Sequence, residues 1–286
     1  MIRPLTSADT AEVLRLLAVR PLHTVFLESL VRAGALGSMP GCFFGCFDGT
    51  SLEGILLVAL RGDTLLETSG PSACARLAEH AATLPIPPRH ILGSEDTTVP
   101  FWNVYRPHAS RVIWERREPV YLLSRGDLDA TAASAGSGKL VRGAERDVDA
   151  VVENSARQYV EDLQQDRRAE DLSGFRERHL RELRAGRWWV LRDRRQIAFQ
   201  VHVGAENANA VQLGGVFTPR ELRGRGYATR GVVEISRRLL RDRPAVSLFC
   251  DASNATARHI YERVGFRVLF YNRSWLLEEA PRGEHL

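Results

Sequence analysis

A basic, glycine-rich stretch, Arg223-Gly-Arg-Gly-Tyr-Ala228, has the residue types and spacing best suited to chemistry in this sequence. Glycines let the backbone curl so that successive N–H groups converge, and the N-terminus of a following helix also favours negative charge. The stretch therefore predicts a phosphate or pyrophosphate site. Two other glycine-rich motifs do not fit. A P-loop requires Gly-x-x-x-x-Gly-Lys-[Ser/Thr], and a dinucleotide fingerprint requires a third glycine where Thr229 stands.

The segments on either side of this stretch predict a strand before it and a helix after it. Residues 210–218 are rich in β-formers, and Pro219 ends that strand because proline has no N–H to donate. Apolar residues then recur at helical spacing until Pro244, and a second strand is predicted at residues 245–250. Strand, helix and strand at this spacing form a crossover unit. Its strands are parallel, and the glycine-rich loop lies at their carboxyl ends.

The pattern Arg-x-x-Gly-x-Ala resembles the acetyl-CoA pyrophosphate loop of the GNAT acetyltransferases. The passage from Gly215 to Thr229 is similar to that family throughout, and Asn254, Tyr261 and Gly265-Phe266 are similar to its Asn, Tyr and Gly-Phe signature. The resemblance covers roughly residues 141 to 278. It implies acetyl-CoA (coenzyme A) as the cofactor, with these cofactor-binding residues: Val216, Phe217, Thr218, Arg223, Gly224, Arg225, Gly226, Tyr227, Ala228, Thr229 and Asn254.

The implied reaction is direct transfer of an acetyl group to a primary amine, of a small molecule or a peptide, in a ternary complex. An amine with a pKa near 10 arrives protonated, so a base must take its proton before it attacks the thioester. Glu161 or His202, directly or through water, is the predicted base, and Tyr261 is the predicted acid for the departing thiolate. Backbone N–H groups near Val216 would hold the developing oxyanion, and Gly214-Gly215 permits the bulge that exposes them.

The acceptor is expected to lie near the paired helices at residues 149–163 and 173–185 and the strand leading to the loop. Less specific interpretations stay open: Glu161 and Asp162 could be a solvated helix face, His202 could face solvent, and Tyr261 could only pack on the sheet. A CoA-binding sensor or structural protein that has lost catalysis is the alternative to an enzyme. The candidate acceptor contacts are Tyr159, Glu161, Asp162, Gln200, His202 and Gln212.

The first half of the chain predicts a second mixed α/β unit. An apolar residue followed by arginine opens a strand at Ile2-Arg3 and again at Val141-Arg142, which suggests a diverged internal repeat. The first copy has no phosphate loop and carries Leu92-Gly-Ser-Glu-Asp96, whose carboxylates would repel a pyrophosphate. An unrelated α/β cap is the alternative for this half.

The expected fold is thus α/β, with tandem GNAT-like units. Each unit is a mixed, mostly antiparallel sheet flanked by helices, with a parallel, splayed strand pair in the C-terminal one. Residues 124–139 carry Gly, Ala, Ser and Asp with scarcely any apolar pattern, which indicates a linker. The expected division is a degenerate N-terminal unit at 1–130 without cofactor, a linker at 131–139, and a catalytic domain at 140–286. It resembles bacterial two-domain GNAT proteins.

Composition excludes several other classes of function. The net charge is +4, but acidic residues are interspersed with arginines throughout and no nucleic-acid motif is present. Cys42, Cys46, Cys74 and Cys250 lack the spacing of a zinc site, so reduced core cysteines are expected. No apolar run reaches the ~18 residues of a membrane span, and the N-terminus lacks a signal-peptide core. We expect a cytoplasmic protein without metal, membrane or nucleic-acid partners; its oligomeric state is left open.

Overall fold

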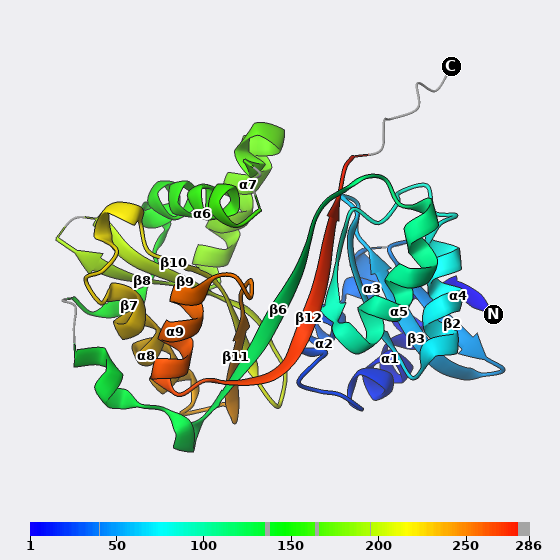
Figure 1. Ribbon diagram of the computed structural model, residues 1–286, viewed down its shortest axis with the longest axis horizontal. Helices are drawn as coiled ribbons and strands as arrows, with labels where there is room; N and C mark the ends of the chain where they lie inside the picture. Colours follow the sequence, from blue (N-terminus) through cyan, green and yellow to red (C-terminus); the bar gives the residue numbers. More distant parts are fainter. Residues whose placement is uncertain (40, 135–137, 164–165, 195, 280–286) are drawn as a thin grey trace. The chain divides into compact units, whose positions relative to one another are not determined.

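The chain folds into two compact units of mixed helix and strand (Figure 1). A computed structural model describes residues 1–39, 41–134, 138–163, 166–194 and 196–279. Unit 1 comprises Met1–Val120, Cys250–Ser253 and Val268–Leu286, and unit 2 comprises Tyr121–Phe249 and Asn254–Arg267. The last strand of the chain therefore belongs to unit 1.

Unit 1 is built on a mixed sheet in the order β1-β2-β3-β4-β5-β12-β6. Asp48-Gly49 lies at the β2–β3 hairpin, as its turn sequence predicted. β4 and β5 are parallel, whereas β12 pairs antiparallel with β5 from Asn272↔Ser94 to Leu276↔His90. The strands are β1 (Ile2–Pro4), β2 (Phe43–Asp48), β3 (Ser51–Val58), β4 (Asp63–Thr68), β5 (His90–Ser94), β6 (Val112–Ser124) and β12 (Arg267–Leu277).

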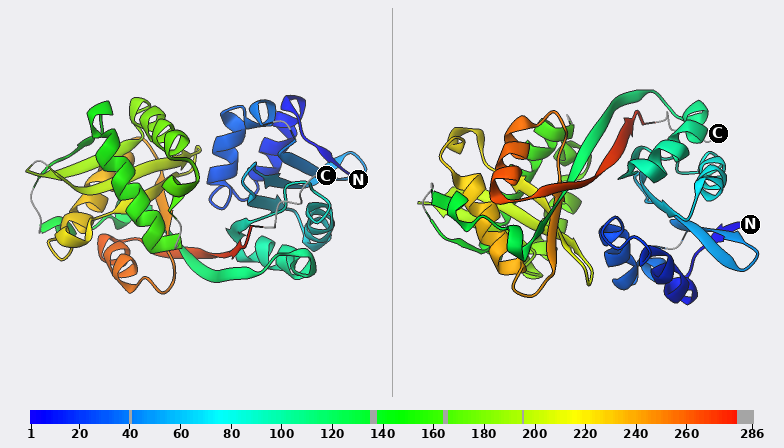
Figure 2. Two further views of the ribbon diagram at one scale, coloured as in Figure 1. Left: turned by 90° about the horizontal axis from the view of Figure 1, so that it is seen from above. Right: turned by 60° about the horizontal axis from the view of Figure 1, so that its bottom comes forward.

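Helices cover both faces of the unit 1 sheet, because alternate residues of its central strand point to opposite faces. Leu56 and Val58 of β3 join the core with α4 and α5, and Ile55 and Leu57 join a separate core with α1 and α2. Figure 2 shows these two helix groups on either side of the strands. The helices are α1 (Thr10–Leu17), α2 (Val25–Arg32), α3 (Ala35–Ser38), α4 (Pro71–Ala81) and α5 (Glu95–Tyr105).

Unit 2 contains strands in the order β11-β10-β9-β8-β7. Trp188 and Val190 of β8 pack with α6 and α7 on one face, while Gly231 of α8 lies against Phe199 on the other face. The strands are β7 (Leu140–Arg142), β8 (Trp188–Asp193), β9 (Gln196–Glu206), β10 (Val211–Phe217) and β11 (Ala245–Phe249). The helices are α6 (Val148–Leu163), α7 (Arg167–Arg184), α8 (Tyr227–Leu239) and α9 (Ala255–Val264).

The segment interpreted as a linker forms two short 3-10 helices, Arg125–Asp127 and Ala130–Ser134, that pack within unit 2. The backbone N–H of Asp129 donates to the carbonyl of Val264 at 2.9 Å, and Ala132 is buried. Residues 135–137 of the predicted linker lie outside the described residues. The division of the chain at residues 130 and 140 remains a prediction.

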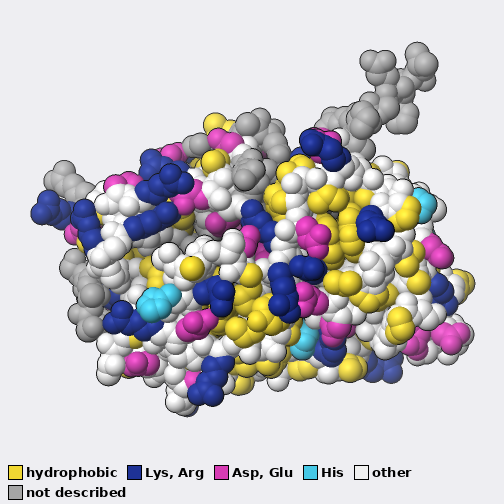
Figure 3. Space-filling view, viewed as in Figure 1, with side chains coloured by type: hydrophobic (Ala, Val, Ile, Leu, Met, Phe, Trp, Pro, Cys, Tyr) yellow, Lys and Arg dark blue, Asp and Glu magenta, His cyan; other side chains and the backbone are white. Residues whose placement is uncertain are grey.

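Three of the four cysteines expected in the core are buried, whereas Cys250 is half-buried just after β11. Arginine side chains lie among carboxylates on the face shown in Figure 3. Cys42, Cys46 and Cys74 are buried, and no disulfide forms among the described residues. Within these same residues no His, Cys, Asp or Glu cluster could hold a metal ion. No helix in the described part of the chain combines the length and apolarity needed to span a membrane.

Candidate active site

The predicted pair of parallel strands, β10 and β11, is adjacent in the sheet of unit 2. β10 and β11 are in register at Val211↔Val246 and Gln212↔Ser247, although β10 continues to Phe217. The short register means that the strands separate toward their carboxyl ends. A splayed strand pair of this kind opens a gap between two backbones, at the end of the sheet where the loop begins.

The predicted bulge in β10 is confirmed. Gly214 pairs with His202 and Phe217 pairs with Gln200, so β10 carries one residue more than β9 between these two pairs. Gly215 adopts a φ of +58°, which favours glycine. A bulge disrupts the ladder locally, and here the two residues between these pairs are Gly215 and Val216. The carbonyl of Val216 lies 3.5 Å from Gln158 Nε2 of α6.

The basic loop forms a turn that leads directly into a helix. After the 3-10 turn Arg220–Leu222, Gly224 and Gly226 adopt φ values of +74° and +81°, and α8 then begins at Tyr227. The first N–H groups of a helix have no intrahelical partner, so those of residues 227–229 form an anion site together with the helix dipole. The Tyr227 side chain is buried, and this residue therefore offers a ligand only its backbone.

The loop arginines bind a carboxylate from α6. Arg223 donates to Glu161 Oε2 at 2.7 Å, and Arg220 Nε donates to Glu161 Oε1 at 2.8 Å. Burial raises the pKa of the Glu161 carboxyl, but hydrogen bonds and charge from both arginines outweigh it and leave that pKa below its usual value. The Glu161 carboxylate is therefore ion-paired with both arginines and is not a strong base. Arg225 donates to the carbonyl of Glu221 at 3.2 Å.

Two features of the loop fit a pyrophosphate-bearing ligand. The hydroxyl of Thr218 is buried and makes no hydrogen bond within the described parts of the chain, so a polar ligand atom could satisfy it. A Cβ added at Gly224 would meet no atom within 4 Å, so the loop has open space on that side. The loop also combines arginine side chains with converging backbone N–H groups, which are the groups that bind anions in proteins.

Asn254 and Tyr261 lie at the start and near the end of α9. Asn254 caps the helix, because its side chain accepts a hydrogen bond from the N–H of Ala257 at 3.0 Å. The Tyr261 ring is buried, edge-on to Tyr121 at 5.7 Å between centroids and tilted against Phe266 at 6.0 Å. Gly265 ends the helix in the left-handed conformation, as predicted.

The candidate acceptor contacts are divided between core and surface. Gln200 is fully buried and donates to Ser155 at 3.1 Å, and Tyr159 packs edge-on to Phe175. Asp162 is exposed at the end of α6, and Gln212 is half-buried on β10. The structure therefore brings His202, on the same face of β9 as Gln200, closest to the bulge.

Burial lowers the pKa of His202 to about 4, so its imidazole is neutral at neutral pH. Nearby Glu182 raises this pKa, whereas Arg187, His179 and Arg178 lower it further. Sequence reasoning missed Glu182, which accepts a hydrogen bond from Trp188 Nε1 at 2.9 Å. The carboxylate is one of many on a charged helix, so no signal in the sequence singled it out.

A family profile matches a segment in the C-terminal part of the chain. The sequence profile of the family described as FR47-like protein matches residues 204–276, a range that contains β10, the loop, α8, β11 and α9. No curated protein matches the chain significantly.

Solved structures resemble the chain over almost its whole length. A GNAT-family acetyltransferase from Colwellia psychrerythraea matches at a TM-score of 0.59 and 9% identity, covering 97% of this chain and 100% of that one. A tandem GNAT protein from the clavulanic acid biosynthesis pathway matches at 0.62 and 15%, covering 98% and 99%. A GCN5-related N-acetyltransferase from Sphaerobacter thermophilus matches at 0.60 and 15%, covering 96% and 94%.

The chain has the GNAT fold. The resemblance inferred from the loop is confirmed at the level of the fold, and the likeness to a tandem GNAT protein extends to both units. At these low identities the likeness carries no information about substrate.

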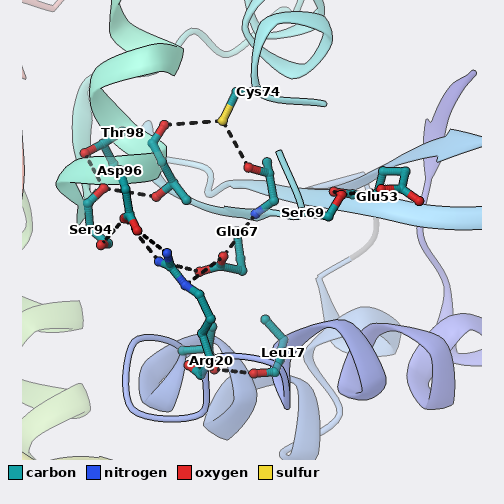
Figure 4. Close-up of polar contacts among 12 residues, drawn as sticks. Leu17, Arg20, Glu53, Glu67, Ser69, Cys74, Ser94, Asp96 and Thr98 are labelled. Carbon is teal, nitrogen blue, oxygen red and sulfur yellow. Dashed lines mark hydrogen bonds and ion pairs between the residues drawn. The ribbon is translucent and has the colours of Figure 1, made fainter. Parts of the chain in front are cut away.

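Unit 1 also has a parallel strand pair, β4 and β5, and an ion-paired cluster of side chains lies beside it. β4 and β5 are parallel at Asp63↔His90 and Thr64↔Ile91, as β10 and β11 are in unit 2. Figure 4 shows Arg20 between Glu67 at the end of β4 and Asp96 at the start of α5. Arg20 lies 3.4 Å from Glu67 and also pairs with Asp96. The Asp96 carboxylate, predicted to repel a pyrophosphate, is therefore bound by an arginine of the same unit.

Proposed function

We propose that this chain is an N-acetyltransferase that uses acetyl-CoA and transfers the acetyl group to a primary amine by direct attack in a ternary complex. The observation that carries the proposal is the loop Arg223–Ala228, with two left-handed glycines at the N-terminus of α8, beside strands that separate after Gln212. The acceptor is the amine of a small molecule or a peptide. The GNAT fold of the whole chain supports this class of reaction.

The loop and the end of β10 would hold the cofactor. Arg223 and Arg225 supply charge, Gly224 and Gly226 let the backbone approach, and N–H groups of Tyr227, Ala228 and Thr229 point to the anion. Val216, Phe217 and Thr218 border the gap between the strands, and Asn254 lies at the start of α9.

Three groups of unit 2 would act on the reacting atoms. A bound thioester supplies an acyl group that an amine can attack. The backbone N–H near Val216 donates to the acyl oxygen, where negative charge develops. His202 accepts the proton of the acceptor amine, and Tyr261 holds a proton for the departing sulfur. We favour His202 over Glu161 as the base, because two arginines already bind the Glu161 carboxylate.

A CoA-binding protein without catalysis is the second candidate. The observation that favours it is the packing of Tyr261, whose buried ring would stabilise α9 even without an acid role. Both candidates share the cofactor site and differ in turnover.

Calorimetry with acetyl-CoA tests the cofactor site. We expect one site per chain, since Arg20 already fills the strand pair of unit 1 with an ion pair. Arg223→Glu with Arg225→Glu should abolish binding, because carboxylates would face the anion. Arg237→Glu with Arg241→Glu, exposed in and just after the C-terminal turn of α8, is the matched control and should leave affinity unchanged. Two sites per chain, or intact binding in the loop variant, would refute the assignment.

Turnover separates the two candidates. The intact chain is assayed against a panel of primary amines with acetyl-CoA, and release of free thiol is recorded. Thiol release that depends on an amine supports the enzyme. Binding of acetyl-CoA without release by any amine supports the non-catalytic candidate.

A further inference from the structure

A cluster of side chains beside the bulge joins α7 to β8 and β9. The Oε2 atom of Glu182 accepts a hydrogen bond from Trp188 Nε1 at 2.9 Å and also lies 3.5 Å from His202 Nε2. Trp188 and His202 are register partners, and their ring centroids are 4.7 Å apart. One carboxylate oxygen therefore reaches both rings.

Burial decides which nitrogen of His202 can exchange a proton with a ligand. The side chain keeps 17% of its exposure, yet Nε2 is buried and makes no hydrogen bond in the described part of the chain. The accessible part of the ring consequently lies away from Nε2. A neutral imidazole carries one N–H, and a carboxylate opposite Nε2 favours the proton there. This tautomer leaves the lone pair of Nδ1 available.

His202 also lies next to the bulge of β10. It pairs with Gly214, and a Cβ added at Gly215 would lie 3.3 Å from the Cβ of His202. The imidazole is therefore anchored to the strand segment whose backbone N–H is assigned to the acyl oxygen. A separation of 3.5 Å between Nε2 and Oε2 is longer than a hydrogen bond, but such contacts often tighten when substrate binds.

We propose that Glu182 is a positioning residue that holds His202 in the Nε2–H tautomer, so that Nδ1 takes the proton from the acceptor nitrogen. The inference rests on the proposed acetyl transfer. The acceptor enters this step as the neutral amine, its ammonium proton having gone to solvent. The bond between nitrogen and the acyl carbon then forms and the bond between carbon and sulfur breaks. The proton from nitrogen ends on Nδ1, and sulfur receives a proton from Tyr261.

The charges around the imidazole fit this role. Burial lowers the pKa of His202 to about 4, with Glu182 opposing that shift and Arg187, His179 and Arg178 adding to it. An imidazole of this kind is neutral at pH 7 and ready to accept a proton. A base this weak does not deprotonate a free ammonium with a pKa near 10. It suits a nitrogen that has become acidic because its bond to carbon is forming.

The first test measures the tautomer without acetyl-CoA, so its result does not depend on the proposed function. Ring nitrogens of histidine are labelled with ¹⁵N in the full chain, and the His202 signals are assigned by their loss in His202→Gln. We expect the Nε2–H tautomer in the wild type and in Glu182→Gln, whose amide oxygen still accepts. Glu182→Met, which removes the acceptor, should populate both tautomers. An Nδ1–H tautomer in the wild type would overturn the inference.

The second test measures turnover with a confirmed amine. We expect kcat to fall at least ~10-fold in Glu182→Met, with partial rescue in Glu182→Gln and unchanged acetyl-CoA affinity. Glu177→Met, on an exposed position of α7, is the matched control and should keep the wild-type kcat. Failure of the wild-type chain to bind acetyl-CoA would instead refute the proposed function. Unchanged kcat in Glu182→Met would overturn the positioning role, and if that variant does not fold, the wild-type tautomer decides.

Discussion

Tyr261 packs as a buried ring, and its hydroxyl has the proposed chemical role of the acid. Its ring contacts Tyr121 and Phe266 within unit 2, so truncating the whole side chain would disturb α9 and reveal little about catalysis. The hydroxyl alone can serve as the acid. A substitution that removes only this group therefore separates the two roles.

Tyr261→Phe should lower kcat by about 10²-fold or more, the usual contribution of general acid catalysis, because the sulfur would leave without a proton donor. Its melting temperature and acetyl-CoA affinity should stay close to wild type, since the ring remains. Tyr227→Phe, a buried tyrosine at the start of α8, is the control and should keep its kcat. Steady-state kinetics and calorimetry measure both variants. Activity within about twofold of wild type in Tyr261→Phe would leave only the packing role.

In the proposed cofactor site, Glu161 would compete with the anionic ligand for Arg220 and Arg223, which already bind its carboxylate. Exposed ion pairs contribute up to about 1 kcal/mol, so Glu161→Gln should bind acetyl-CoA up to about fivefold more tightly. Its kcat should change by less than tenfold if His202 is the base. Glu153→Gln, which removes an exposed ion pair with Arg157 on the same helix, should change neither quantity. A large loss of kcat with unchanged affinity would identify Glu161 as the base instead.

The sequence predicted those features of the site that are local in the chain. Arg223–Ala228, the glycines of the bulge and Gly265 could be assigned because each depends on the conformation of a few consecutive residues. The pair of Glu161 with Arg223 could not, because 62 positions separate its members. The contact of Glu182 with His202 also depends on how α7 packs on β9, which no short pattern encodes.

At the scale of elements, the bulge of β10 gives a matched pair of substitutions. Gly215→Ala should lower the free energy of unfolding by about 1–3 kcal/mol, because its φ of +58° strains alanine and its Cβ would lie 2.8 Å from Trp188. Gly214→Ala meets no atom within 4 Å and should cost much less. Urea unfolding of both variants measures the difference. Equal stability would show that β10 has no bulge at Gly215.

The strand pair of unit 1 shows what the sequence could not reveal at this scale. The sequence showed that unit 1 lacks a phosphate loop. It could not show the contact between Arg20 and Glu67, because these residues lie far apart in the chain and only the fold brings them together. Burial raises the pKa of Glu67 to about 7, although Arg20 opposes the shift. The raised value means that the folded state holds a proton that the unfolded chain releases near pH 4.5.

The stability contributed by Glu67 should therefore fall as the pH rises from about 5 to about 7 and then level off, because its carboxyl binds more protons in the folded state in this window. His202, whose pKa burial lowers to about 4, contributes the opposite trend below pH 6.5, so the quantity to compare is the difference in unfolding free energy between the wild type and a Glu67 variant. At 1.36 kcal/mol per pKa unit the loss is at most about 3 kcal/mol. Glu67→Gln should remove this decline, so that its stability relative to the wild type rises with pH, whereas Glu79→Gln, exposed on α4, should keep the wild-type profile. Urea unfolding at pH 5, 6, 7 and 8 tests this. A wild-type slope that survives in Glu67→Gln would assign the dependence to other groups.

At the scale of the whole molecule, the two units interleave along the chain. The sequence predicted two GNAT-like units, and the fold has two, but β12 pairs with β5 in unit 1 while residues 121–134 belong to unit 2. Composition suggested a linker after residue 123 because Gly, Ala and Ser carry no periodic pattern. Backbone contacts of such residues do not appear in any hydrophobic pattern, so the packing of this segment could not be foreseen.

Fragment 121–267 should consequently be more stable than fragment 140–267. The shorter fragment loses the hydrogen bond from Arg125 to the carbonyl of Leu240 at 2.8 Å and that from Asp129 to Val264 at 2.9 Å. It also loses Tyr121, which donates to Glu262 at 3.1 Å and packs on Tyr261. Both fragments omit β12. Without its partner β5, this strand would have an unpaired edge that could pair with another chain.

We expect fragment 121–267 to bind acetyl-CoA, because the loop, β10 and α9 all lie within it. Fragment 140–267 should melt several degrees lower and bind about 10-fold more weakly, since α9 loses neighbours that fix its end beside the site. Thermal melts and calorimetry compare the two fragments under the same conditions. Fragment 140–286, the division favoured by the sequence, should aggregate more than either, because it carries β12 without β5. Equal melting temperatures and affinities for 121–267 and 140–267 would show that residues 121–139 only connect the units and do not stabilise the site.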